Sequence, residues 1–316
     1  MPHITFIHGI ANKPSSEKLL ENWRHELADG GLDLGVHNVS SSMVYWADVL
    51  YPEPEASETV MESVDHGLGM NELDEDMSWV DGLPDSQKQM VESLAGKLGL
   101  DKTAPGGDRN AMPSRPMDEE AEFEFEAIPL PWSIKERVMK RLLKDVHHYL
   151  FNETFSPRPG ESYEVQTHIR KLFVDQLTKD KAEKDGPHVV VSHSMGTVIS
   201  YDCLKNVPGC PAVDGYLTVG SPLGISEVHD NFDPEHERKD AFPSGTVLGN
   251  WVNVYDRLDP VAFDARLAND YQKSGTQVIT DTRVRNSGRW RHSSYKYYGQ
   301  EKLCNHLADL LGLSLS

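Results

Sequence analysis

Cysteine is scarce in this sequence. The 316 residues include only Cys203, Cys210 and Cys304, and no two of them form a Cys-x-x-Cys pair. An odd number without paired spacing predicts neither a disulfide framework nor a zinc site. Long apolar runs are also missing, because no stretch reaches the ~18 residues that a membrane-spanning helix needs. We therefore expect idle thiols in a reducing compartment and no transmembrane segment.

Positive charge is in short supply as well, and the formal net charge is −19. Nucleic acids bind to basic surfaces, so this balance excludes them as partners. The acidity is concentrated in one segment: residues 51–126 carry 20 acidic and 5 basic side chains, whereas the rest of the chain carries 30 and 26. One acidic segment is therefore attached to a chain of ordinary, balanced composition.

The chain begins directly with "HITFIHG", without a basic region or a long apolar stretch before it. This beginning contains no recognisable signal peptide. We expect a soluble, cytoplasmic protein, and a peripheral contact with a membrane surface stays possible.

Strands alternate with helices through most of the chain. We expect strands at residues 3–8, 43–46, 189–191, 216–219, 251–255 and 277–282, and helices from Ser16 to Gly30 and at 132–149, 163–178, 195–206 and 298–311. Such alternation predicts an α/β fold with a mostly parallel central sheet flanked by helices. No internal repeat is present.

The regular alternation fails between residues 51 and 159. Residues 51–126 are rich in Pro, Gly, Asp, Glu and Met, with short helices expected at 58–67 and 86–98. This segment is too long for a simple connection. We therefore divide the chain into a core, residues 1–50 and 160–316, and an acidic insertion with a helical lid or cap, residues 51–159. A disordered acidic loop is the alternative for the insertion, and a protein partner for it is unknown.

The most informative motif is "HVVVSHSMGTVISYD", in which a strand runs into Ser192-His193-Ser194-Met195-Gly196 and then into a helix. A serine nucleophile at the carboxyl end of a strand needs a sharp turn, and small residues two positions before and after it allow that turn. The pattern matches Gly-x-Ser-x-Gly with serine in place of the first glycine. Ser194 is therefore the candidate nucleophile, and the Met195 N–H is a candidate oxyanion donor.

A second oxyanion donor is expected in "FIHGIAN". Gly9 permits a sharp turn at the end of the first strand, and the Ile10 N–H would then face the oxyanion. For the side chain of His8 we expect a structural role in the turn.

A serine hydroxyl needs a histidine base, and the base needs an acid that holds its tautomer. The expected order along the chain is nucleophile, acid, base. After Ser194, Asp259 in "DPVA" follows one strand and His292 follows the next. Asp256 is the alternative acid. His306 and His229 are the alternative bases.

Other clusters carry less information. The acidic loop "HDNFDPEHE" could hold a metal, although such loops arise by chance, and we expect neither a metal nor a cofactor. The adjacent histidines of "VHHY" point in different directions on a helix and are expected to pack or lie on the surface. The basic run "RVRNSGRWR" beside His292 is expected to be a solvated loop, or a site that attracts an anionic group or the acidic insertion.

Together, "HGIANKP", "VVVSHSMGTVISYDCL", "LTVGSPLG", "NVYDRLDPVA" and "RHSSY" resemble segments of the α/β-hydrolase superfamily. Within it they are similar to the branch of intracellular lipases and phospholipases of the DDHD kind. The resemblance covers residues 1–46 and 187–316 and does not reach the insertion. It implies an α/β-hydrolase fold with Ser194 as nucleophile, Asp259 as acid and His292 as base. The hairpin that usually precedes the His-Gly strand is missing, which implies a trimmed sheet.

The expected activity is hydrolysis of a carboxylic ester, such as a lipid ester, through an acyl-enzyme. A thioesterase or an amidase could use the same three residues. An alternative of another class is a non-catalytic scaffold that binds a partner through its acidic insertion.

Overall fold

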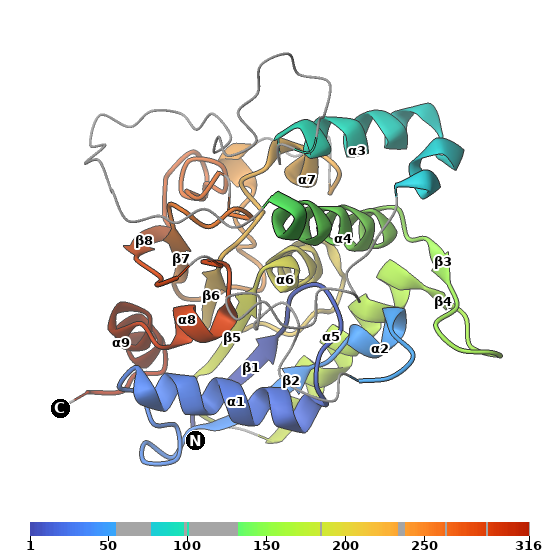
Figure 1. Cartoon of the computed structure of the whole chain (residues 1–316). Coiled ribbons are helices and arrows are strands. Elements are labelled where there is room, and N and C mark those ends of the chain that lie inside the picture. The colour runs from blue at the N-terminus through green and yellow to red at the C-terminus, as the bar shows by residue number, and fades with distance from the viewer. Residues whose placement is uncertain are drawn as a thin grey trace.

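The computed structural model describes residues 1–54, 77–97, 100, 132–183, 185–232, 238–262, 264–288 and 290–315. Figure 1 shows the elements in this part of the chain: β1 (His3–Ile7), α1 (Ser16–Asp29), β2 (Ser40–Val44), α2 (Ala47–Leu50), η3 (Ser78–Gly82), α3 (Asp85–Lys97), α4 (Trp132–Leu150), β3 (Thr154–Phe155), β4 (Tyr163–Glu164), α5 (Val165–Glu183), β5 (His188–His193), α6 (Met195–Asn206), β6 (Gly215–Val219), α7 (Ser226–His229), η4 (Arg238–Asp240), β7 (Trp251–Asp256), β8 (Thr280–Val284), α8 (Ser294–Tyr298) and α9 (Glu301–Leu310).

The centre of the fold is a six-stranded sheet with the order β2-β1-β5-β6-β7-β8, and all of its neighbouring strands are parallel. The connections from β1 to β2, β2 to β5, β5 to β6 and β6 to β7 contain helices, whereas the described residues between β7 and β8 form none. The α/β class and the mostly parallel sheet predicted from the alternation are therefore confirmed. β3 and β4 form a separate antiparallel pair.

Helices cover both faces of the sheet (Figure 1). The side chains of β1 alternate between these two faces. Ile4 and Phe6 point to one face and pack in a hydrophobic cluster with residues of α1, α8 and α9. Ile7 belongs to the cluster on the other face, which includes residues of α4, α5 and α6. Side chains of successive strand residues point to opposite faces, so a strand buried on both faces is mostly apolar, and His3 and Thr5 are the buried polar residues of β1.

Two strands lie at positions other than those expected. β2 spans Ser40–Val44 instead of 43–46, and β8 spans Thr280–Val284 instead of 277–282. Both are edge strands of polar sequence, "SSSMV" and "TDTRV", so hydrophobic periodicity does not mark their limits. The last helix, expected at 298–311, is present as α9, and the short helix α8 before it was not expected.

Within the predicted insertion, α3 and α4 coincide closely with the helices expected at 86–98 and 132–149. The helix expected at 58–67 lies outside the described residues. Leu94 of α3 and Leu142 and Val146 of α4 are buried in the same hydrophobic cluster as α5 and α6. These two helices therefore share the core of the sheet, and the boundaries drawn at residues 50 and 160 stay a prediction.

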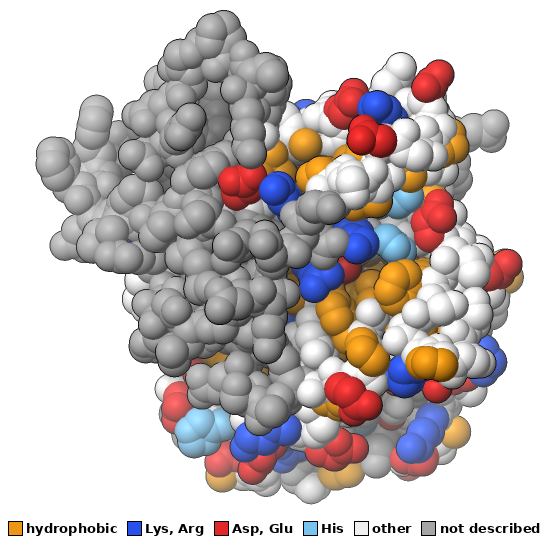
Figure 2. Space-filling model, turned by 45° about the vertical axis from the view of Figure 1, so that its right-hand side comes forward, with side chains coloured by type: hydrophobic (Ala, Val, Ile, Leu, Met, Phe, Trp, Pro, Cys, Tyr) orange, Lys and Arg blue, Asp and Glu red, His pale blue; other side chains and the backbone are white. Residues whose placement is uncertain are grey.

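Among the residues that the structure describes, no helix combines the length and apolar character needed to cross a bilayer. Figure 2 turns the side of the molecule that carries β3 and β4 toward the viewer. On the described part of this face, hydrophobic side chains lie next to basic and histidine side chains, with acidic ones mostly toward the edge.

Candidate active site

The candidate site lies where the order of the strands reverses. After β1 the chain forms β2 on one side of β1, and β5 then pairs on the other side, with Ile7 opposite Ser192. The segments that follow β1 and β5 therefore emerge next to each other at the carboxyl end of the sheet. Crevices at such reversal points are the usual ligand sites of open α/β sheets.

Ser194 occupies a sharp turn between β5 and α6. Its backbone has φ 56° and ψ −129°, a conformation that residues other than glycine rarely adopt. The turn is held by the Ser194 N–H, which donates to Val219 O at 3.0 Å. A Cβ atom at Gly196 would lie 2.6 Å from the carbonyl oxygen of His8, and one at Gly9 would lie 2.6 Å from the Ser194 Cβ. Of the two small residues expected around Ser194, Gly196 is therefore required by close backbone approach.

His292 connects the serine to a carboxylate. The Oγ of Ser194 lies 2.7 Å from Nε2 of His292, and Nδ1 of His292 lies 2.8 Å from Oδ2 of Asp259. All three residues are buried, with exposed fractions of 3% or less. The structure thus brings together three residues that are 33 to 98 positions apart in the sequence.

Asp259 is surrounded by hydrogen-bond donors. Its Oδ1 accepts from the N–H groups of Val261 and Ala262, and its Oδ2 accepts from the Tyr297 hydroxyl at 2.8 Å as well as from His292. Burial opposes ionisation of Asp259, but the charge of His292 and these donors outweigh it and hold its pKa below the usual value. An ionised carboxylate at this position holds the Nδ1–H tautomer of His292, which leaves Nε2 free to accept the serine proton.

Asp256, the alternative acid, lies close by in a different environment. Its Oδ1 accepts from the Leu258 N–H, and its Oδ2 accepts from the Asn286 N–H and lies 3.3 Å from the Arg291 guanidinium. Burial raises its pKa despite these partners. The geometry therefore places Asp259 against His292 and pairs Asp256 with a cation of the "RVRNSGRWR" segment.

His193 lies next to the nucleophile, but its orientation suits a supporting role. Its Nε2 is 2.8 Å from the backbone oxygen of His292, and the two rings are 4.8 Å apart. Burial, and then the charge of His292, lower the pKa of His193 well below its usual value. A neutral His193 that donates from Nε2 fixes the backbone of His292.

The two expected oxyanion donors flank the serine. Met195 is the first residue of α6, so its N–H is one of the amides that a helix cannot bond internally. Ile10 lines the same pocket as Ser194 and His292, a depression of about 230 Å³ including the solvent at its mouth. Both expected oxyanion donors therefore belong to residues beside Ser194, and their contact with an oxyanion stays a prediction.

Three further residues of the site were not expected from the sequence. Lys13 and Trp290 line the pocket, and Tyr297 bonds to Asp259. The ammonium of Lys13 donates to the Ile10 carbonyl at 2.7 Å, and the residue is only 5% exposed. A lysine four residues after a turn glycine and a tyrosine in "SSYKYY" have no periodic signal, and only proximity in the fold identifies them.

The other histidines considered lie in other contacts. His306 bonds to Thr282 at 2.8 Å, and His229 bonds to its neighbour Asp230. The possible metal loop "HDNFDPEHE" lies outside the described residues from position 233 to its end. His147 and His148 bond to Gln87 and to the Lys144 carbonyl, which agrees with packing roles on α4.

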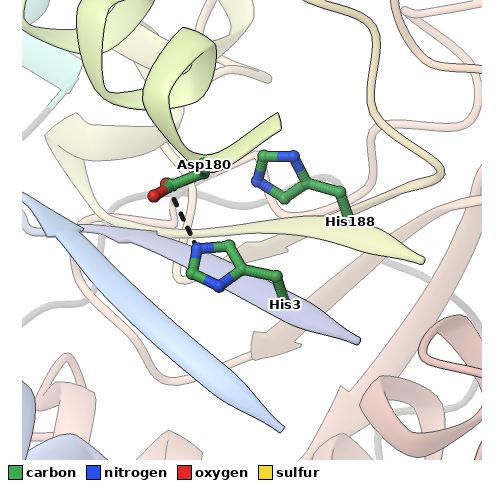
Figure 3. Close-up of side chains that lie close together, drawn as sticks. All are labelled: His3, Asp180 and His188. Carbon is green, nitrogen blue, oxygen red and sulfur yellow. Dashed lines mark ion pairs between the residues drawn. The ribbon is translucent and has the colours of Figure 1, made fainter. Parts of the chain in front are cut away.

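A separate polar cluster, missed from the sequence, lies at the opposite, amino-terminal end of the sheet. His3 and His188 are the first residues of β1 and β5 and are paired in register, and Asp180 of α5 lies over them (Figure 3). One possible ligand atom of each lies within 4.8 Å of the others. However, the Thr5 hydroxyl lies 2.7 Å from both Asp180 Oδ2 and His188 Nε2.

The remaining contacts of the His3–Asp180–His188 cluster are also internal. Ser42 donates to the same Asp180 oxygen, and His3 Nε2 lies 3.2 Å from it. These partners, opposed by burial, lower the pKa of Asp180 to about 2. A metal ion would have to break this set of bonds, so we assign the cluster a structural role that joins β1, β2, β5 and α5.

No protein-family model matches the chain, and no curated protein matches it either.

Proposed function

We propose that this protein is a serine hydrolase that cleaves carboxylic esters, and that its sheet is of the α/β-hydrolase type. The observation that carries the proposal is the chain of contacts from Ser194 Oγ to His292 Nε2 and from His292 Nδ1 to Asp259, at 2.7 and 2.8 Å. The strained turn at Ser194 supports it, because backbone strain persists where the surroundings impose it and is concentrated at functional sites.

In the proposed reaction, His292 Nε2 accepts the Ser194 hydroxyl proton while Oγ attacks the ester carbonyl carbon. The N–H groups of Ile10 and Met195 stabilise the oxyanion, and His292 then returns the proton to the departing alcohol. Water attacks the resulting acyl-enzyme with His292 again as base. This second step releases the acid and restores the serine.

The same three residues could cleave a thioester or an amide. The choice of an ester rests on the resemblance to intracellular lipases. A panel of p-nitrophenyl esters, acyl-CoA thioesters and phospholipids separates the three reaction types. The non-catalytic scaffold, in which the acidic insertion binds a partner, predicts turnover of none of them.

The decisive experiment is labelling with a fluorophosphonate probe, which reacts with activated serines. We expect the wild type to be labelled at Ser194 and Ser194→Ala to be unlabelled. Ser200→Ala is the matched control, because Ser200 is a buried serine of α6 that bonds to Tyr216. An unreactive wild type, or undiminished labelling of Ser194→Ala, contradicts the proposal.

A further inference from the structure

Three side chains hold the loop that follows β1. Each of them bonds to one backbone group next to the Ile10 N–H: the Gly9 carbonyl, the Ile10 carbonyl or the Ala11 N–H. His8 Nδ1 lies 2.8 Å from the Gly9 carbonyl, and the Lys13 ammonium donates to the Ile10 carbonyl at 2.7 Å. The Ala11 N–H donates to Oδ2 of Asp145 at 3.1 Å. The peptide groups on both sides of Ile10 are therefore fixed.

The bond from His8 determines where the Ile10 N–H points. The Trp46 N–H donates to His8 Nε2 at 3.0 Å, so Nε2 is the acceptor and Nδ1 carries the proton that goes to Gly9. In a planar trans peptide the C=O and the following N–H point in opposite directions. Holding the Gly9 oxygen against His8 therefore directs the Ile10 N–H to the other side.

The contact with Asp145 is different in kind, because it comes from a distant helix. Asp145 lies in α4, 134 residues from Ala11, and is only 4% exposed. Ala11 has φ 67°, a left-handed conformation that costs energy for any residue with a side chain. Such a conformation persists where the surroundings impose it. Here the Asp145 carboxylate supplies the acceptor for the strained residue's amide.

We propose that Asp145 is a positioning residue, through which helix α4 holds the oxyanion loop in its catalytic shape. The proposal rests on the proposed function, since it assigns the Ile10 N–H to the oxyanion. It extends the expected role of α4, because the helix then affects the rate of the chemical step as well as access to the pocket. Movement of α4 away from the loop would release Ala11 and turn the Ile10 amide.

Two substitutions distinguish the role of Asp145 as a hydrogen-bond acceptor from the role of its negative charge. Asp145→Asn keeps an oxygen that accepts from the Ala11 N–H, whereas Asp145→Leu has a similar size and no acceptor. We expect kcat for a p-nitrophenyl ester to fall roughly tenfold to a hundredfold in Asp145→Leu, the loss typical of a small misplacement of a catalytic group. KM should stay within about twofold, and Asp145→Asn should keep most of the wild-type kcat.

The matched control lies on the same helix. Tyr149→Phe removes the 2.6 Å hydrogen bond from the Tyr149 hydroxyl to Asp202 on α6, and so loosens α4 without touching the loop. We expect its melting temperature to fall with little change in kcat. Fluorophosphonate titration of active sites corrects kcat for any unfolded fraction of each variant.

Hydrogen exchange at the Ala11 amide gives a readout that does not depend on activity. We expect faster exchange in Asp145→Leu than in the wild type, Asp145→Asn or Tyr149→Phe. An unchanged kcat in folded Asp145→Leu, or an equal loss in Tyr149→Phe, overturns the positioning role while leaving the hydrolase intact. A wild type that neither turns over esters nor reacts with the probe overturns both.

Discussion

The hydroxyl of Tyr297 donates to Oδ2 of Asp259, the same oxygen that faces Nδ1 of His292. The hydroxyl oxygen in turn accepts the N–H of Asp256 at 2.9 Å. Tyr297 therefore joins the two neighbouring acids and supplies one of the donors that keep Asp259 ionised. The bond from Asp256 joins α8 to the last residue of β7.

Tyr297→Phe should lower both activity and stability. A hydrogen bond to a charged group contributes about 1.5–3 kcal/mol, so we expect kcat to fall roughly tenfold and the free energy of unfolding to fall by about 2 kcal/mol. Ester hydrolysis and urea denaturation measure the two effects. Tyr271→Phe removes a buried hydroxyl bond to the Leu223 carbonyl and should cost stability alone. Equal kcat in both variants contradicts a role of the Tyr297 hydroxyl in keeping Asp259 ionised.

Asp259→Asn and Asp256→Asn distinguish the two candidate acids. In Asp259→Asn the amide favours the wrong tautomer of His292, and we expect kcat to fall by about 10³–10⁴. Asp256→Asn loses its ion pair with Arg291 and should reduce stability more than activity. Steady-state kinetics of the two variants, with thermal melts, test this. A larger kcat loss in Asp256→Asn would reverse the assignment.

Ser194→Gly should relieve the strain of the turn. A residue with a side chain at φ 56° and ψ −129° costs about 1–3 kcal/mol, partly offset in glycine by about 0.5–1 kcal/mol of backbone entropy. We therefore expect Ser194→Gly to be about 1 kcal/mol more stable than Ser194→Ala, although both should be inactive. Urea unfolding measures the difference, and a less stable glycine variant would rule out strain as the cause.

Gly196→Ala should damage the site through the backbone. The new Cβ would meet the carbonyl oxygens of His8 and Ile7 at 2.6 and 2.7 Å, which forces β1 and α6 apart. We expect a loss of about 1–3 kcal/mol and of most activity. Gly96→Ala, in α3 with no atom within 4 Å, should instead gain about 0.5–1 kcal/mol and keep full activity. Similar melting temperatures for the two variants would contradict this.

His8 should make the protein sensitive to acid. Burial, and then the charge of Lys13, lower the pKa of His8 from 6.5 to about 3. Between these values the unfolded chain binds a proton that the folded protein excludes, so the free energy of unfolding falls as the pH falls. The contribution is about 1.4 kcal/mol per pH unit, and it is absent above pH 7.

Urea unfolding of the wild type and of His8→Asn between pH 7 and pH 4.5 tests the contribution of His8. The variant lacks this titration, so its stability should decline less steeply. Parallel pH dependences would show that His8 does not contribute.

Local sequence was sufficient to predict the turn at Ser194 and the helix that follows. α6 spans Met195–Asn206, as the pattern predicted, because the strand, the small residues and the helix are neighbours in the chain. The edge strands β2 and β8 were misplaced because their polar side chains interact with other elements. Ser42 of β2, for example, bonds to Asp180 of α5, and no periodicity in "SSSMV" indicates this.

The sequence by itself determined the α/β class, the parallel sheet and the order of the candidate nucleophile, acid and base along the chain. Only the tertiary structure decided that His292 faces Asp259 and not Asp256, that Tyr297 and Lys13 belong to the candidate site, and that α4 contacts the loop after β1. The physical reason is the range of the interactions. Helix and strand patterns arise between near neighbours, whereas the contact between Ala11 and Asp145 joins residues 134 positions apart that only the folded sheet brings together.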